Sequence, residues 1–460
     1  MLARSLFLLL VLPLATASAQ AWQSVSQGST TPVARQSLTL AYDSNRQCTV
    51  LFGGCDANSN PRGDTWEWNG SLWLQRQPVT NPPARYGHAM TYDSARQRVV
   101  MFGGRDTSQA ELADTWEWDG TDWLQATTAT APLARIHSAM AFDSSRQCTV
   151  LFGGHSPATM FGDTWEWDGS TWYLRATAGA PARHAHAMVY DQKAQLTLLF
   201  GGSPLPGSQM NDLWSWNGVL WSQIPTTNTP SVRQHHTLTY DTVHHLTLLQ
   251  GGCYLGGGLR DDSWLWNGTD WILLGGPRVT PPRAMAAMTY DAARGRMFLF
   301  GGRDGAVGIP SEHVLGDAWE CAPAPASFQV TGPGCPGSNG TPTLDAAPLS
   351  LPRIGQSFVV HLAQLYNQAA TVVVGCLGGP QVPPLNLTPF GMPNCLLHVV
   401  PYQNTFLFAY SGQVDWTIPI PPAPFLVGQT AHLQALVVDP AAGNQLEAVV
   451  TNGGAATIGW

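Results

Sequence analysis

The sequence predicts an all-β fold built from six copies of one unit, and three observations predict it. A Gly-Gly pair ends a hydrophobic run six times, at steps of 48 to 50 residues between Gly53 and Gly301. An Asp-x-Trp motif follows each pair, and an arginine stands 18 residues before each pair. A period near fifty residues with these features is typical of a four-stranded blade repeated around an axis.

Each copy accommodates four short strands. In the second copy, these strands are expected at residues 85–92, 97–104, 114–120 and 123–126, with a polar turn between the first two. The nearly continuous apolar runs predict strands that neighbouring copies bury on both faces. The two tryptophans of each Trp-Glu-Trp motif share one face of their strand, so they can lie against the next copy.

The two ends of the repeat region predict how the ring of copies closes. Tryptophans of the outermost strand occur six times, but the first of them, Trp22, precedes the first Gly-Gly pair. The last copy ends at residues 317–321 without a partner tryptophan. We therefore expect residues 21–26 to supply the outer strand of the sixth blade, which would leave no open sheet edge between the ends.

These features give the chain a resemblance to a known family. Residues 22–320 resemble a six-bladed kelch β-propeller of the secreted bacterial kind, on the evidence of six Gly-Gly pairs, six Asp-x-Trp motifs and six arginines. The resemblance implies an all-β propeller domain over residues 20–321. It says little about function, because kelch propellers serve as enzymes, peptide binders and glycan binders alike.

Residues 1–19 are expected to form a cleaved signal peptide. Arg4 supplies the positive start, residues 6–14 the apolar run, and residues 17–19 the small-residue cleavage pattern. No later segment reaches the roughly 18 apolar residues that a spanning helix needs. The mature protein should therefore be secreted or held at the cell surface.

Residues 322–328 form a short linker rich in alanine and proline, and residues 329–460 are expected to form a β-sandwich-like accessory domain. Apolar runs broken by proline and glycine predict its strands. Its Gly- and Cys-containing stretches at 332–340 and 391–395 resemble a C-terminal module of other exported bacterial repeat proteins. Its terminal position makes attachment or sorting the expected role.

The charge of the chain excludes two classes of partner. Charged residues make up 11% of the sequence, the formal net charge is −8, and Lys193 is the only lysine. A nucleic-acid or anionic-membrane surface would need clustered basic residues. The expected partner is therefore an extracellular glycan or protein.

The eight cysteines predict at most one disulfide bond. Inside the propeller, Cys48 matches Cys148, two blades away, and these equivalent positions lie beyond the roughly 7 Å that a disulfide allows. In the last domain, a bridge can form among Cys335, Cys376 and Cys395, and Cys376–Cys395 is the favoured pair. No cysteine pair has the spacing of a zinc site, and we predict no metal and no cofactor.

The six repeated arginines open the inner strands near the mouth of the central channel, and two interpretations compete. The resemblance to peptide-binding kelch domains implies that they line a ligand pocket, as an anion-receptive ring. Alternatively, each arginine holds a backbone carbonyl of the neighbouring blade, which its presence in every copy favours. These arginines are Arg35, Arg85, Arg135, Arg183, Arg233 and Arg283.

Histidines and loop residues differ between the copies, and differences are expected where a specific ligand binds. The histidines of the inner strands could form a polar or metal-binding wall, or could hydrogen-bond within the strands. They are His88, His137, His184, His186, His235 and His236. The loops between second and third strands, expected on the same face as the arginines, add Arg105, Asp106, His155, Tyr254, Arg260, Arg303 and Asp304.

Enzyme chemistry has weaker support in the sequence. A copper oxidase of the kelch kind needs two histidines and two tyrosines around the metal, whereas the tyrosines here recur at equivalent strand ends. No pair of carboxyl groups is placed as a general acid and base. We expect an exported, non-enzymatic protein that binds a glycan or protein through its loop face. The alternatives are a carbohydrate-active enzyme, such as an epimerase or lyase, and a structural cell-surface component.

Overall fold

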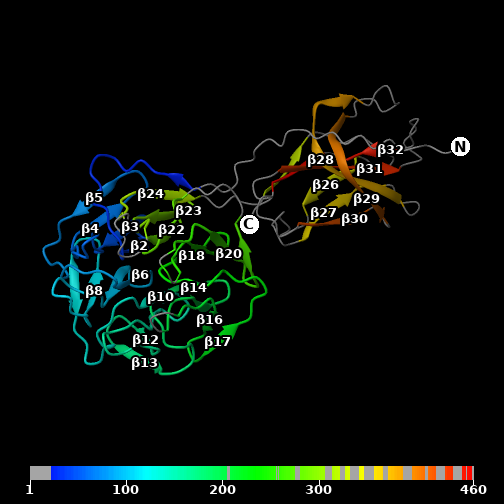
Figure 1. Ribbon diagram of the computed structural model, residues 1–460. Helices are drawn as coiled ribbons and strands as arrows, with labels where there is room; N and C mark the ends of the chain where they lie inside the picture. Colours follow the sequence, from blue (N-terminus) through cyan, green and yellow to red (C-terminus); the bar gives the residue numbers. More distant parts are fainter. Residues whose placement is uncertain are drawn as a thin grey trace. The chain divides into compact units, whose positions relative to one another are not determined.

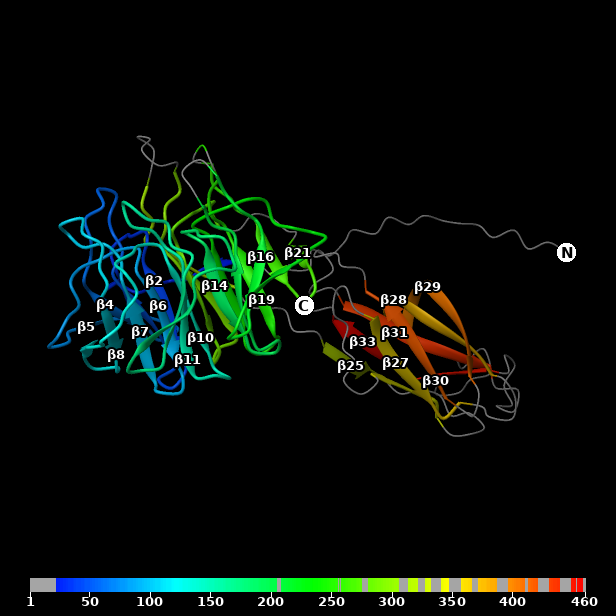
Figure 2. The same cartoon turned by 90° about the horizontal axis from the view of Figure 1, so that it is seen from below.

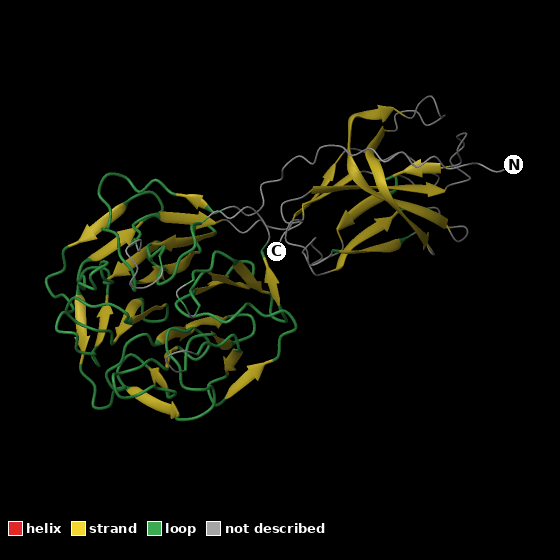
Figure 3. Cartoon of the chain, in the orientation of Figure 1, coloured by secondary structure: helices red, strands yellow, loops and turns green. Residues whose placement is uncertain are grey.

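The described part of the computed structural model contains only strands, turns and loops (Figures 1 and 3). The described residues are 22–204, 208–254, 256, 258–274, 280–305, 313–321, 327–331, 341–346, 357–365, 371–386, 396–409, 413–420, 430–438, 448–451 and 453–457. Within these ranges there is no helix, and so none that could cross a membrane. The predicted signal peptide, residues 1–19, lies outside them.

The chain divides into two compact units, Ala21–Pro323 and a unit that includes Ala324–Trp460. The first unit repeats one antiparallel four-stranded sheet, so the fold is propeller-like. Its first three sheets are β2 (Thr39–Asp43), β3 (Cys48–Phe52), β4 (Thr65–Trp68) and β5 (Trp73–Arg76); β6 (Ala89–Asp93), β7 (Arg98–Phe102), β8 (Thr115–Trp118) and β9 (Trp123–Ala126); and β10 (Ala139–Asp143), β11 (Cys148–Phe152), β12 (Thr164–Trp167) and β13 (Trp172–Ala176).

The next two sheets are β14 (Ala187–Asp191), β15 (Leu196–Phe200), β16 (Leu213–Trp216) and β17 (Trp221–Ile224); and β18 (Thr237–Asp241), β19 (Leu246–Gln250), β20 (Ser263–Trp266) and β21 (Trp271–Leu273). A further sheet joins β22 (Ala287–Asp291), β23 (Arg296–Phe300) and β24 (Ala318–Cys321) to β1 (Gln23–Ser24). The sheets follow one another around the unit in sequence order, and β22 contacts β2 (Figure 1).

The first strand of the chain pairs with the last strand of this unit. In the β1–β24 register, Gln23 lies opposite Glu320 and Ser24 lies opposite Trp319. The amide of Val25 adds a hydrogen bond of 2.9 Å to the carbonyl of Ala318. The N-terminal segment therefore occupies the outer position that the sequence analysis assigned to it.

Indole rings pack between neighbouring sheets. Trp123 meets Phe52 of the preceding sheet at a centroid distance of 5.1 Å, and Trp73 meets Phe300 at 5.2 Å. Burial of one indole is worth about 4–6 kcal/mol of transfer free energy, against about 1 kcal/mol net for one hydrogen bond. Contacts between the sheets are therefore mainly apolar.

A ring of backbone hydrogen bonds, 2.8–3.0 Å long, also links the six sheets where the inner strands begin. Each amide donates to the carbonyl of the matching residue one sheet earlier, and every member has a left-handed φ between 51° and 64°. The members are Ser37, Gly87, His137, Ala185, His235 and Met285. This turn explains why the second inner strand begins at Ala89 and not at residue 85, as the sequence analysis expected.

The described residues of the second unit form two sheets (Figure 2). One sheet contains β25 (Ser327–Thr331), β33 (Gly453–Thr457), β31 (Thr430–Val438), β28 (Thr371–Asn386) and β29 (Leu396–Ala409), with β32 (Ala448–Val450) paired to β31. The other contains β26 (Thr343–Ala346), β27 (Ser357–Ala363) and β30 (Val414–Pro419). Val360 and Trp416 of one sheet pack in a single buried cluster with Leu433 and Val437 of the other.

Cys395 and the side chain of Cys376, the pair predicted to form a disulfide bond, lie outside the described part of the chain. Five other cysteines, all in the first unit, are buried and form no disulfide bond within the described ranges. Burial raises the pKa of the Cys48 and Cys148 thiols to about 12.

Candidate functional site

The six repeated arginines form ion pairs inside their own sheets. Arg85 donates from Nη1 and Nη2 to the two oxygens of Asp114, at 2.6 and 2.8 Å, and from Nη1 to the carbonyl of Gly103 at 3.0 Å. Its side chain is fully buried. The equivalent pairs are Arg35–Asp64, Arg135–Asp163, Arg183–Asp212, Arg233–Asp262 and Arg283–Asp317.

This arrangement favours the structural interpretation of the arginines and corrects it in one respect. A guanidinium neutralised by a bidentate carboxylate is not available to an anion in the channel, so the six do not form an anion-receptive ring. The carbonyl that Arg85 holds, at Gly103, belongs to its own sheet and not to a neighbour. The neighbouring sheet is held by the arginine's own carbonyl, which accepts from the amide of Gly54 at 2.9 Å.

The partner aspartates are held in the charged form. Burial by itself would raise the pKa of Asp114, but the hydrogen bonds and positive charge of Arg85 outweigh burial and keep this pKa below its usual value. The indole Nε1 of Trp116 donates a further hydrogen bond of 2.7 Å to the same carboxylate. In the Asp-x-Trp motif, the carboxylate therefore holds both the repeated arginine and the tryptophan two residues later.

Three of the predicted histidines are packed inside the scaffold. His88, His186 and His236 lie edge-on to Phe52, Phe152 and Phe200 of the preceding sheets, at centroid distances of 5.5 to 5.7 Å. Nε2 of His88 also lies 2.5 Å from the hydroxyl of Thr39. Burial lowers the pKa of His88 and His236 to about 3, so both rings are neutral at pH 7.

The other histidines form a cluster at the end of the axis where the inner strands begin. The possible ligand nitrogens of His137, His155 and His184 all lie within 4.8 Å of one another. The ring of His235 lies 4.9 Å from that of His137, centroid to centroid. Burial, together with the neighbouring imidazole of His155, lowers the pKa of His184 to about 4. The structure thus joins His155, predicted as a loop residue, to the histidines of the inner-strand starts.

The remaining predicted loop residues have local partners. Arg105 is ion-paired with Glu111, and Asp106 accepts hydrogen bonds from the amides of Ser108 and Ala110 within its own turn. Asp304 accepts from the amide of His313 at 3.1 Å.

The last three predicted loop residues are Arg303, Arg260 and Tyr254, and they differ in exposure. Arg303 is buried, with 1% of its surface exposed. Arg260 lies 4.7 Å from the ring centre of Tyr254, and Tyr254 is the exposed aromatic residue of this set.

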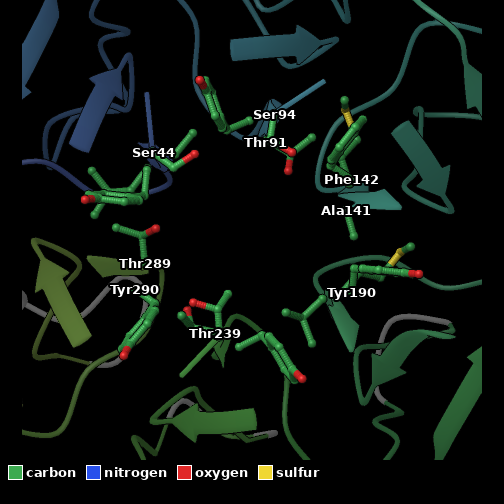
Figure 4. A pocket seen from close by; sticks show the side chains of 18 of the residues that line it. Ser44, Thr91, Ser94, Ala141, Phe142, Tyr190, Thr239, Thr289 and Tyr290 are labelled. Carbon is green, nitrogen blue, oxygen red and sulfur yellow. The ribbon is translucent and has the colours of Figure 1, made fainter. Parts of the chain in front are cut away.

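A cavity lies at the end of the inner strands opposite the histidine cluster, where the strands end and turn (Figure 4). Its volume is about 490 Å³, within the 300–1,000 Å³ range typical of ligand sites. The hydroxyls of Thr91, Thr239 and Thr289 lie around it, with Ser44 and Ser94 at the turns (Figure 4). None of the described residues that line it carries a charge.

The sequence analysis did not select this cavity, because the tyrosines that line it recur at equivalent strand ends and were assigned to the blades. The repeated tyrosines line it, at the opposite end of the strands from the histidine cluster. Burial and the nearby Asp43 raise the pKa of Tyr92 to about 12, so its phenol stays protonated. The tyrosines and the histidine cluster therefore do not converge on one centre, as the copper oxidase arrangement would require.

Comparison with known proteins gives a distant structural likeness. No known protein family and no curated protein matches this sequence. Among solved structures, one titled "Structure of YjhT" is similar to 63% of this chain over 95% of its own length, with 13% identity and a TM-score of 0.49. A likeness of this size carries no conclusion about function.

Proposed function

We propose that this chain is an exported, non-enzymatic binding protein whose first unit is a closed six-bladed kelch-type propeller. The pairing of β1 with β24 and the ring of backbone hydrogen bonds support closure. The repeated Gly-Gly, arginine and Asp-x-Trp positions, and the ion pairs that join them, support the kelch assignment. The second unit is a β-sandwich, supported by the buried cluster that its two sheets share.

The ligand we propose is a neutral glycan, bound in the axial cavity at the ends of the inner strands. The single observation that carries this proposal is the uncharged lining of the cavity, where hydroxyls stand among aromatic and aliphatic side chains. Neutral sugars are bound through hydroxyl hydrogen bonds and apolar ring contacts, whereas an anionic ligand would need cations that the described lining residues do not offer. The absence of charged groups among these lining residues also favours binding over acid–base catalysis.

The test is binding of the mature protein to an array of neutral oligosaccharides, with a blocking variant. Thr91 lines the cavity and is partly exposed, so Thr91→Phe fills the space without removing a scaffold contact. We expect the affinity for the bound glycan to fall at least about tenfold. The matched control, Tyr254→Ala, changes an exposed aromatic residue on the loop face and should leave binding unchanged.

The reverse result, loss of binding in Tyr254→Ala and unchanged binding in Thr91→Phe, would place the ligand on the loop face. The loop face is the second candidate location. That location is favoured by the exposed Tyr254 ring with Arg260 over it, an arrangement suited to contact with a sugar or a protein. Equal binding by both variants and the wild type would reject both locations. Release of a product from a uronic or sialic acid would replace the binding proposal with a carbohydrate-active enzyme.

A further inference from the structure

We propose that His137, His155 and His184 bind a late first-row divalent metal ion of the Zn²⁺ or Cu²⁺ class. This inference goes beyond the proposed glycan binding, because it concerns the opposite end of the inner strands. Imidazole nitrogen is the ligand that these ions share, and three histidines with one open position make a known kind of zinc site.

The three imidazoles are close enough to share one ion after small side-chain rotations. Their ligand nitrogens lie within 4.8 Å of one another, and tetrahedral ligands at zinc–nitrogen bond lengths lie about 3.3 Å apart. The ring centres of His155 and His184 are 4.7 Å apart, and those of His137 and His155 are 5.8 Å apart. The proposal therefore requires rotations of the rings that bring these nitrogens closer together.

Two of these rings have buried nitrogens without a hydrogen-bond partner in the described part of the protein. Both nitrogens of His137 are buried there without a hydrogen-bond partner, and so is Nδ1 of His184. A buried polar atom without a partner costs about 1–3 kcal/mol. A metal ion would supply a partner for one nitrogen of His137 and for Nδ1 of His184, which gives a reason for this unfavourable arrangement.

The backbone holds all three histidines in place. His155 exchanges backbone hydrogen bonds of 3.0 Å with Ile136, and His184 exchanges bonds of 2.9 Å with Ser203. His137 belongs to the ring of hydrogen bonds that links the sheets. Ligands on such fixed positions lose little freedom when an ion binds, which favours affinity.

The cluster is specific to one place in the ring. The pair equivalent to His155 and His184 is Arg105 and Ile136 one copy earlier, and Ser203 and Gln234 one copy later. A scaffold role would recur in every copy, as the arginine–aspartate pairs do. The positive charge of Arg105, which lies near the cluster, is neutralised by Glu111, and this reduces its repulsion of a cation.

The test is direct binding of Zn²⁺ to the mature protein. Protein stripped with a chelator is dialysed against Zn²⁺, and the bound metal is measured by mass spectrometry and by calorimetric titration. We expect about one equivalent in the wild type and less than about a tenth in His184→Ala and in His155→Gln. Circular dichroism of the chelated proteins checks folding, and His155→Gln decides the matter should His184→Ala not fold.

The matched control is His313→Ala, because His313 is an exposed histidine of the same unit, with 72% of its side chain accessible. This variant should keep the full equivalent and the rise in melting temperature that Zn²⁺ causes in the wild type. Less than about a tenth of an equivalent in the wild type would overturn the proposal. Binding of Zn²⁺ by both cluster variants at the wild-type level would overturn it as well.

Discussion

At the scale of single residues, the charged groups of the first unit mostly hold the structure. The six buried arginines are each matched by the aspartate of the Asp-x-Trp motif, and the partners stand 28 to 34 positions apart in the sequence although they touch in the fold. Removing one partner of such a pair leaves a buried charge unpaired, which costs far more than the pair contributes.

The first prediction concerns one of these pairs. Arg85→Ala should lower the free energy of unfolding by about 3–5 kcal/mol, because it leaves the carboxylate of Asp114 and the carbonyl of Gly103 without the guanidinium that pairs with them. Urea denaturation measures this loss. The matched control is Arg98→Ala, which removes an exposed pair with Asp119 at 3.7 Å and should cost less than about 1 kcal/mol. Equal losses in both variants would contradict the structural role.

The second prediction concerns acid stability. Buried His88 and His236 have folded-state pKa values lowered to about 3, against about 6.5 in an unfolded chain. Between these values the unfolded state binds more protons, so stability is lost as the pH falls below about 6.5. Each histidine should contribute a loss of about 2 kcal/mol between pH 7 and pH 5.

Urea unfolding of the wild type and of His236→Gln at several pH values checks this. The variant should show a smaller loss over the same range, whatever its stability at pH 7. The paired aspartates act at lower pH, because their lowered pKa values stabilise the fold above pH ~4 and that contribution disappears as they protonate. A flat profile between pH 7 and pH 5 would contradict the burial of the histidines.

At the scale of elements, β1 has only two residues, but its removal is expected to lower the stability of the first unit strongly. It pairs with β24. The nearby Gln27 donates from Nε2 to the carbonyl of Gly316 and accepts at Oε1 from the indole Nε1 of Trp73, both at 2.9 Å. Trp22 beside it is buried, with 5% of its surface exposed. The segment thus connects the last sheet to the first.

The third prediction follows from this connection. Removal of residues 20–28 should lower the melting temperature by about 5 °C or more, because it removes a buried indole and exposes a strand edge. Calorimetry of the truncated and the full mature chain measures the change. Gln23→Ala is the control, since the side chain of Gln23 is exposed and its backbone pairing survives. An unchanged melting temperature after truncation would reject closure by β1.

At the scale of the whole molecule, the two units have separate buried clusters among the described residues. The fourth prediction is therefore that residues 20–321, produced alone, fold and melt within a few degrees of the same unit in the full chain. Calorimetry and circular dichroism test this. Aggregation or loss of the cooperative transition in the isolated unit would show that it needs the second unit.

Much of the first unit followed from local sequence, because each strand carries its own pattern. The hydrophobic runs into Gly-Gly and the tryptophan pairs determined the strands, and the unmatched Trp22 and residues 317–321 indicated that β1 pairs with β24. The left-handed turn at the inner strand starts was missed, because five of its six members are not glycine and only the hydrogen-bond ring reveals it.

Repetition along the chain was enough to establish the all-β repeat and the order of its sheets, since strands and turns depend on neighbours in sequence. Tertiary structure alone decided what the charged and polar groups do. Arg85 meets Asp114, and His155 meets His184, because folding brings together residues that are far apart in the sequence. Such contacts depend on how separate strands and sheets pack, and no local pattern encodes the distance between two side chains across those boundaries.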